Sequence, residues 1–131
     1  MATAAVQVGN GLWLARNTLT NASASTAEEI TGLPPTGAVL RLDSKLTAGS
    51  GASIDPVLNK DSGSSANSVV VQATDSGDRV PPETATWVAE AGFATYSNTE
   101  DVDKSLYYWP KPNAGSNNTV TFEIHFQTGW E

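Results

Sequence analysis

The chain has 131 residues, of which 39% are hydrophobic and 8% aromatic, and its seven basic and fourteen acidic residues give a net charge of −7. This length suits one compact domain and is short for two. The acidic balance disfavours nucleic acid and membranes as partners, because phosphate backbones and anionic lipids repel a negative surface. Since the sequence has no cysteine, it excludes disulfides, thiolate metal sites and thiol nucleophiles.

The segment at the start of the chain, residues 2–10, is small and polar and has only Val6 and Val8 as apolar anchors. It is typical of an extended N-terminal arm that frays or docks on a neighbour. No stretch approaches the roughly 18 apolar residues of a membrane-spanning helix, and no basic leader precedes an apolar run. We therefore expect synthesis in the cytoplasm without export.

The remaining residues, 11–131, are expected to form a single domain of short strands, since Ser, Thr, Asn, Gly and Pro dominate and no apolar run has helical spacing. The stretch 18–31 fits either a strand after a polar loop or one turn of helix. Turn signals separate the segments, the strongest being Gly-Leu-Pro-Pro-Thr-Gly at 32–37. In chain order, the predicted strands lie within 12–16, 18–31, 38–46, 52–58, 68–74, 84–91, 105–109 and 119–127.

Two of these segments, 38–46 and 119–127, alternate apolar and polar residues, which is the pattern of a strand with one covered face and one wet face. The predicted core is formed by their apolar positions, Leu40, Leu42, Leu46, Val120, Phe122, Ile124 and Phe126. Seven or eight short strands, with no helical spacer long enough for parallel crossovers, predict an all-β fold, an antiparallel β-sandwich or jelly roll.

Catalytic residues do not stand out in this pattern. The only histidine, His125, lies on the polar face of the last predicted strand, and no Gly-x-Ser-x-Gly segment accompanies it, so a hydrolytic triad is not favoured. Glu90 is the only acid in an apolar and aromatic neighbourhood, but a glycosidase needs a second carboxylate that the sequence does not identify. The sequence therefore predicts a protein that is not an enzyme.

Acidic residues concentrate in two predicted loops, 75–78 and 100–103, and offer oxygen ligands of the kind that calcium prefers. Neither loop has the Asp-x-Asp-x-Asp-Gly series with a distal glutamate, and Asp and Gly are common in ordinary turns. Phosphate-binding and dinucleotide-binding glycine patterns are also missing. We expect no cofactor and no metal, with a structural ion in the acidic loops as the alternative.

Four tryptophans and three tyrosines supply much of the large apolar area. On a strand at 105–109, Tyr107 and Trp109 share one face and Tyr108 takes the other, so at least one large ring lies outside a single covered face. Either a second sheet or another subunit covers that ring, or the rings form a platform for sugars. Core or subunit packing is the favoured interpretation.

Three segments carry a resemblance to a known group of proteins. They are Gly-Ala-Val-Leu-Arg-Leu-Asp-Ser-Lys-Leu at 37–46, Leu-Tyr-Tyr-Trp-Pro-Lys-Pro at 106–112 and Val-Thr-Phe-Glu-Ile-His-Phe at 120–126. With the small-residue arm and the lack of cysteine, the chain resembles the head decoration, or cement, proteins of tailed bacteriophages. The likeness is one of pattern and composition and extends over residues 12–130.

The resemblance implies a virion structural protein, a β-sandwich or jelly roll that lies on the outer capsid surface and stabilises neighbouring capsid subunits without doing chemistry. Its implied partners are the major capsid protein and copies of the chain itself, as a homotrimer at threefold positions. The alternative function is a carbohydrate-binding or receptor-binding β-sandwich of a phage tail or fibre. The predicted interface residues, assigned because the core does not use them, are Val6, Val8, Trp13, Tyr108, Trp109 and Trp130.

Overall fold

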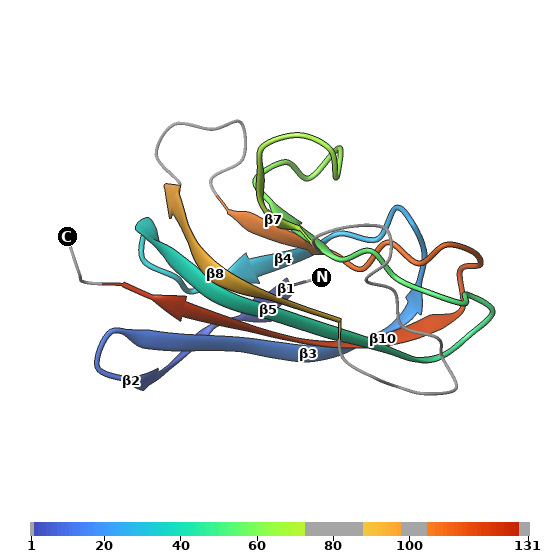
Figure 1. The fold of residues 1–131 in the computed structure, drawn as a ribbon, viewed down its shortest axis with the longest axis horizontal. Helices are drawn as coiled ribbons and strands as arrows, with labels where there is room; N and C mark the ends of the chain where they lie inside the picture. Colours follow the sequence, from blue (N-terminus) through green and yellow to red (C-terminus); the bar gives the residue numbers. More distant parts are fainter. Residues whose placement is uncertain (1, 73–87, 98–104, 129–131) are drawn as a thin grey trace.

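The computed structural model describes residues 2–72, 88–97 and 105–128 and consists of two β-sheets packed face to face (Figure 1). These residues form ten strands and no helix, and accordingly no described helix is able to cross a membrane. The strands are β1 (Ala2–Ala4), β2 (Val6–Gly9), β3 (Leu12–Ala22), β4 (Glu28–Thr31), β5 (Thr36–Ala48), β6 (Val57–Asn59), β7 (Val69–Gln72), β8 (Val88–Ser97), β9 (Leu106–Trp109) and β10 (Asn118–Gln127).

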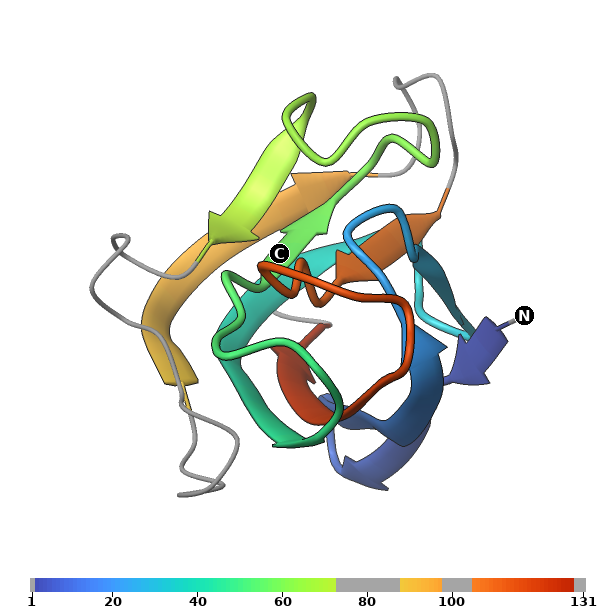
Figure 2. The same ribbon diagram turned by 90° about the vertical axis from the view of Figure 1, so that its right-hand side faces the viewer.

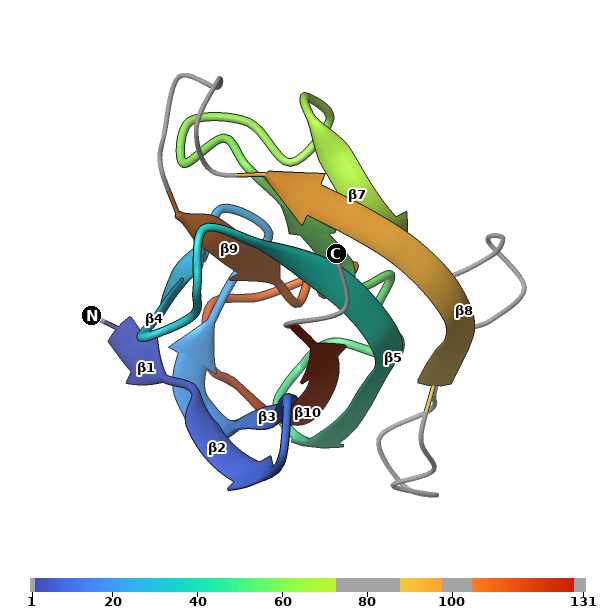
Figure 3. The same ribbon diagram turned by 90° about the vertical axis from the view of Figure 1, so that its left-hand side faces the viewer.

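The strands divide equally between the two sheets. Sheet A has the order β1-β4-β9-β6-β7, and sheet B has the order β2-β3-β10-β5-β8 (Figure 3). Neighbouring strands are antiparallel throughout, with the exception of β1 and β4, which are parallel. The all-β, mainly antiparallel sandwich is therefore confirmed, whereas the predicted number of seven or eight strands is wrong for the residues described.

The two additional strands come from the segment predicted to be an extended arm. β1 lies at the edge of sheet A and β2 at the edge of sheet B, so the chain crosses from one sheet to the other between them. At the crossing, the Ala5 amide donates to the Thr31 carbonyl at 2.8 Å. Thr3 is buried, and its hydroxyl donates to Glu28 at 2.6 Å. The sequence pattern misses these strands because backbone pairing and small polar residues, rather than apolar alternation, hold them in place.

Strand β10 runs through the middle of sheet B and alternates buried and half-buried residues along its whole length, as predicted. Leu40 is the exception among the predicted core residues, since it is only half-buried. It is the extra residue of a β-bulge, because Val39 and Arg41 on either side of it pair with consecutive residues of β10. The bulge shifts the alternation, so Val39 is buried in its place. The buried members of the predicted core are Leu42, Leu46, Val120, Phe122, Ile124 and Phe126.

Tyr108 on β9 joins the two sheets across the core. Its ring stacks on Phe122 of β10, with centroids 4.2 Å apart and an interplanar angle of 23°. Its hydroxyl donates to Ser44 Oγ on β5 at 2.7 Å. Burial raises the pKa of the Tyr108 hydroxyl above its ordinary value, and the hydrogen bond to Ser44 offsets this only in part.

We expect the protein to lose stability as the pH rises above about 10, the ordinary pKa of tyrosine. Above that pH the unfolded chain releases the Tyr108 proton while the folded chain keeps it, so deprotonation favours unfolding. Urea unfolding at increasing alkaline pH should show this loss. Tyr108→Phe should make the loss less steep, at a cost of about 1 kcal/mol near neutral pH from the missing hydrogen bond. Equal steepness in both proteins would contradict the assignment.

At one end of the sandwich, the loop after β5 and the loop before β10 lie side by side (Figure 2). Buried Asn118 connects them, because its Oδ1 accepts the Gly51 amide at 2.8 Å and its Nδ2 donates to the Ala114 carbonyl at 2.9 Å. Gly49 has a φ of +119°, and a Cβ there would lie 2.6 Å from the Asn118 Cα. The approach of the two loops thus requires a glycine at this position.

Candidate interaction surface

Exposed apolar side chains gather on the β2–β3 hairpin. In the described part of the chain four large hydrophobic residues are exposed, and three of them belong to this hairpin. Val6 is 54% exposed, Val8 60% and Leu12 42%. We call these three residues the N-terminal patch. Scattered apolar residues are normal on a protein surface, but a local group of them marks a candidate contact site.

Glycine and strand pairing shape the hairpin that carries the patch. Gly11, in the turn, has a φ of +72°, and a Cβ there would lie 2.7 Å from the Thr128 carbonyl oxygen, so the turn requires a glycine. The Gly11 carbonyl also accepts the Thr128 amide at 2.9 Å, which ties the turn to the end of β10. Val6 pairs directly with Leu14, and residues opposite each other in a sheet share a face. The hairpin therefore presents its apolar residues from a fixed position.

β2 is also the outermost strand of sheet B, so one side of its backbone has no strand partner among the described residues. Natural edge strands usually carry lysine, proline or a bulge that discourages pairing with another chain. The sequence Val-Gln-Val-Gly has no charge and no proline, and a bulge between Gln7 and Gly9 is the one protective feature among these. This edge is therefore competent to pair with another polypeptide.

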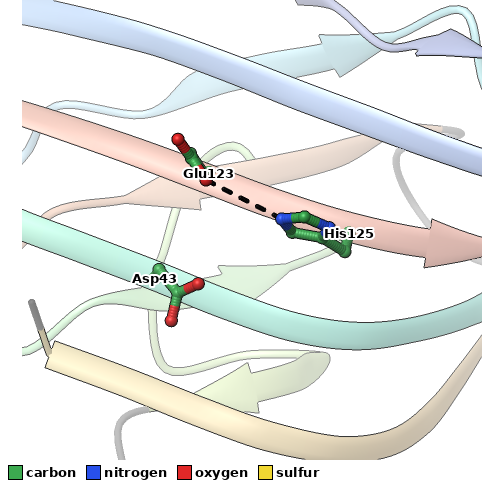
Figure 4. Close-up of side chains that lie close together, drawn as sticks. All are labelled: Asp43, Glu123 and His125. Atoms are coloured by element: carbon green, nitrogen blue, oxygen red, sulfur yellow. Dashed lines mark ion pairs between the residues drawn. The ribbon is translucent and has the colours of Figure 1, made fainter. Parts of the chain in front are cut away.

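The outer face of sheet B next to the hairpin is charged, and five of its residues form pairs. Arg16 Nε lies 2.9 Å from Glu123 Oε2, and Arg41 Nε lies 2.8 Å from Asp43 Oδ1. His125 Nε2 lies 3.8 Å from the other Glu123 oxygen, Oε1 (Figure 4). The ladder of charges runs across β3, β10 and β5, the three central neighbours of the sheet.

Three members of this ladder, Asp43, Glu123 and His125, are near enough to one another to hold an ion, because their ligand atoms all lie within 4.8 Å. Each carboxylate already pairs with an arginine, Glu123 through Oε2 and Asp43 through both of its oxygens, so the negative charge of the group is already compensated. His125 lies on the polar face of its strand, as the alternation predicts, and contacts a carboxylate that Arg16 neutralises. The geometry fits a structural ladder of charges better than a catalytic or metal centre.

We expect Arg16→Ala to lower the free energy of unfolding by less than about 1 kcal/mol, because exposed ion pairs contribute little. The effect should fade in about 1 M salt, which screens surface charges. Urea unfolding of the wild type and the variant at low and high salt provides the measurement. A large loss that persists in high salt would mean that the ladder does more than balance surface charge.

A groove of about 290 Å³ lies between β7 and β8. These two strands are at the sheet edges remote from β2 (Figure 3). The described residues that line it include Val69 and Val70 of β7 and Thr95 and Tyr96 of β8, with Lys60 beside them. Val69 is 41% exposed and is the fourth exposed hydrophobic residue of the described chain. The groove thus has a mixed lining, in which two valines lie among polar residues such as Ser68, Thr95 and Ser97.

The loop after β6 holds one wall of this groove in place. Asn59 is buried, and its Nδ2 donates to the carbonyls of Ser64 and Asn67 at 2.7 and 3.0 Å. Asp61 accepts the Asn67 side-chain amide at 3.0 Å and the Gly63 backbone amide at 2.7 Å, and these hydrogen bonds lower the pKa of its carboxyl. The groove is therefore bordered by an organised loop.

Three of the predicted interface residues lie in or beside the hairpin. Val6 and Val8 are exposed, whereas Trp13 is half-buried against the core and its Nε1–H donates to Thr128 Oγ1 at 2.8 Å. Leu12 was not among the predicted interface residues, although the alternation along its strand places it on the opposite face from Trp13. Leu12 lies on the opposite strand face from Trp13, and the leucine face points outward.

Two other predicted interface residues lie inside the chain. Tyr108 occupies the core, and Trp109 is buried with its Nε1–H donating to Asn59 Oδ1 at 2.8 Å. Val69, at the groove, had no distinguishing signal because it is one of three consecutive valines. Several residues considered in the sequence lie outside the described residues: Trp130, the side chain of Glu90 and the acidic loops 75–78 and 100–103.

Among the described residues, the exposed large hydrophobic side chains thus lie on the β2–β3 hairpin and at Val69 on β7. The function has to be inferred from these surfaces. Comparison with protein-family models and with curated proteins finds no match for this chain.

Proposed function

We propose that this chain is a virion structural protein that decorates the outer surface of a capsid and stabilises neighbouring capsid subunits. The observation that carries the proposal is the N-terminal patch, an uncharged and exposed apolar hairpin at the edge of a β-sandwich. Such a surface is suited to adhesion between proteins, since association removes its apolar side chains from water, which is favourable. The neighbouring charged groups are salt-bridged, which is consistent with a protein that does no chemistry.

The strand order adds support. Without β1 and β2, the two sheets read β3-β10-β5-β8 and β4-β9-β6-β7, and successive strands from β3 to β6 alternate between them. Two four-stranded antiparallel sheets connected in this way are the arrangement expected of a jelly roll, an architecture found in viral capsid and lectin domains. A fold by itself does not assign a function, so the surface remains the main argument.

In this role the partners are the major capsid protein and other copies of the chain, as a homotrimer at threefold positions. An individual contact made by a small patch is weak. Binding to a repeating shell multiplies it, because each contact made raises the effective concentration for the next. A small apolar patch is therefore sufficient for a decoration protein, although it would be small for a stable interface between two isolated proteins.

Cryo-electron imaging of the virion encoded with this chain tests the proposal. We expect density for the sandwich on the outside of the expanded capsid, in a fixed number of copies per shell. Mass spectrometry of purified particles provides an independent count of copies. Absence of the chain from the particle, or its location in the tail alone, would refute the capsid role.

A carbohydrate-binding or receptor-binding module of a tail or fibre is the second candidate, because lectin domains share the jelly-roll architecture. Sugar platforms use exposed aromatic rings. None of the exposed large hydrophobic residues in the described ranges is aromatic, which favours the adhesive role. Titration with glycans while tryptophan fluorescence is recorded separates the two, since a decoration protein should show no response and a sugar-binding module should show saturable quenching.

A further inference from the structure

We propose that Asn10 is a site of spontaneous deamidation, and that the carboxylate formed there closes the N-terminal patch to adhesion. The second half of this inference rests on the proposed function, because it regulates the surface with which the chain would bind a capsid. Asn10 and Gly11 form the turn of the β2–β3 hairpin, between Val8 and Leu12 of the patch. One covalent change in this turn therefore acts directly beside the patch.

The reaction needs only the Asn10 side chain, the backbone amide that follows it and water. The Gly11 nitrogen loses its proton and attacks Asn10 Cγ, so that a bond forms between these two atoms. The bond between Cγ and Nδ2 then breaks, and the side-chain nitrogen leaves with a proton as ammonia. Water opens the resulting cyclic imide at either of its two carbonyls and gives aspartate or isoaspartate. Glycine favours the attack because it has no Cβ to obstruct it.

Asn10 differs from the other asparagines of the chain both in sequence and in surroundings. It is the only asparagine that is followed by glycine. It is exposed, and its side chain has no hydrogen bond within the part of the chain that the structure describes. Asn21 is exposed as well, but alanine follows it. Hydrogen bonds hold the side chains of the other described asparagines, which are Asn17, Asn59, Asn67, Asn113, Asn117 and Asn118.

The backbone of the turn is not of the kind that two-residue hairpins prefer. The preferred turns, types I′ and II′, both require a positive φ at the first turn residue. Gly11 has a φ of +72°, whereas the φ of Asn10 is not positive, so the turn belongs to neither type. A bulge between Gln7 and Gly9 lies directly beside it. The twist of such a turn matches its strands poorly, and this favours the rotation that brings Asn10 Cγ to the Gly11 nitrogen.

Deamidation places a charge on a segment that has none. Residues 2–15 contain no charged side chain, and one added carboxylate takes the net charge of the chain from −7 to −8. A charge at an edge strand discourages pairing with another chain, and a carboxylate beside apolar side chains has to lose its water when they are covered. Isoaspartate also lengthens the backbone by one carbon, in a turn whose Gly11 carbonyl accepts the Thr128 amide at 2.9 Å. Both products therefore weaken adhesion.

Peptide mapping by mass spectrometry tests the site on the full chain. The purified protein is incubated at neutral and at mildly alkaline pH and is then digested with trypsin. Cleavage after Arg16 releases residues 1–16, in which Asn10 is the only asparagine. We expect the Asn10 amide to be lost about tenfold faster than that of Asn21, the exposed internal control, because alanine carries the Cβ that glycine lacks. The loss should accelerate as the pH rises, since the attacking nitrogen has to be deprotonated.

Two variants test the effect on adhesion, which is measured as binding to expanded capsids that lack the chain. Asn10→Gln keeps a neutral amide on a side chain too long for the same ring closure, and Asn10→Asp carries the charge of the product from the start. Fresh Asn10→Gln should bind as the wild type does, and Asn10→Asp about tenfold more weakly. Incubation should weaken the wild type alone. Circular dichroism checks folding, and Asn10→Ser replaces Asn10→Gln if that variant does not fold.

Three results would overturn the inference. They are an Asn10 amide that is lost no faster than that of Asn21, an Asn10→Asp variant that binds as well as the wild type, and incubation that weakens Asn10→Gln as much as the wild type. A chain that loses the Asn10 amide but is absent from the virion would refute the capsid role and leave the modification site intact. A chain that is present on the virion and keeps this amide would do the reverse.

Discussion

Phe122→Ala should destabilise the protein by about 3–5 kcal/mol, the usual cost of removing a large aromatic side chain from a core. Phe122 is fully buried on the central strand of sheet B and stacks on Tyr108, which belongs to the opposite sheet. The substitution therefore removes a contact that holds the two sheets together and leaves a cavity between them. Since small domains are stable by only about 5–15 kcal/mol, the substitution would remove a large share of the free energy of unfolding.

Urea unfolding followed by circular dichroism measures this change. Phe122→Leu is the matched control, because it keeps the apolar character and much of the volume, and it should cost clearly less than the alanine variant. Thr121→Ala, on the outer face of the same strand, should have a small effect, since Thr121 is only half-buried and its hydrogen bond to Thr18 is exposed. Equal losses for inward and outward substitutions would contradict the assigned faces of β10.

Asn118→Ala should cost about 3 kcal/mol, because it leaves several buried backbone groups without a hydrogen-bond partner. The Asn118 side chain accepts the Gly51 amide and donates to the carbonyls of Ala22 and Ala114. These three groups belong to different segments of the chain, so one amide group fastens the end of β3 and both adjacent loops. We expect the end of the sandwich shown in Figure 2 to open before the rest unfolds.

Asn117→Ala is the control for this substitution. Asn117 is adjacent in sequence and also binds the opposing loop, through the Ser50 amide and hydroxyl, but both bonds are exposed. Water replaces them when they are lost, so the cost should stay below about 1 kcal/mol. Chemical denaturation measures both variants, and hydrogen exchange of the Gly51 amide should accelerate in Asn118→Ala alone. If the two variants lost the same stability, burial of Asn118 would not be the cause.

Sequence reasoning works well for β10, where apolar and polar residues alternate and the pairing strands on both sides reinforce the pattern. It fails at Leu40, because a β-bulge inserts one residue and reverses the alternation for the residues before it. A bulge depends on the register of two separate strands, and no local pattern in 38–46 reveals it. The core of the sandwich was thus predictable in composition but not in its detailed register.

The exposure of the predicted interface residues was predictable only in part. Val6 and Val8 are exposed, as expected of a short segment of small residues that cannot form a core of its own, and their role in an interface stays a prediction. Tyr108 and Trp109 are buried because sheet B covers one side of β9 and Asn59 of β6 meets the Trp109 indole. Long-range coverage of this kind depends on tertiary packing. The groove is likewise formed by β7 and β8, which belong to different sheets.

The first nine residues contribute one strand to each sheet, and this has a consequence for any shortened form of the protein. Cleavage after Gly9 would remove the edge strands β1 and β2, one from each sheet. The backbones of β4 and β3 would then lose their hydrogen-bonding partners on that side. Exposed edge strands pair with strands of other molecules, so the cleaved protein would be prone to aggregate even though its core side chains were unchanged. The N-terminal segment therefore covers one edge of each sheet, and an intact N-terminus protects the protein from aggregation.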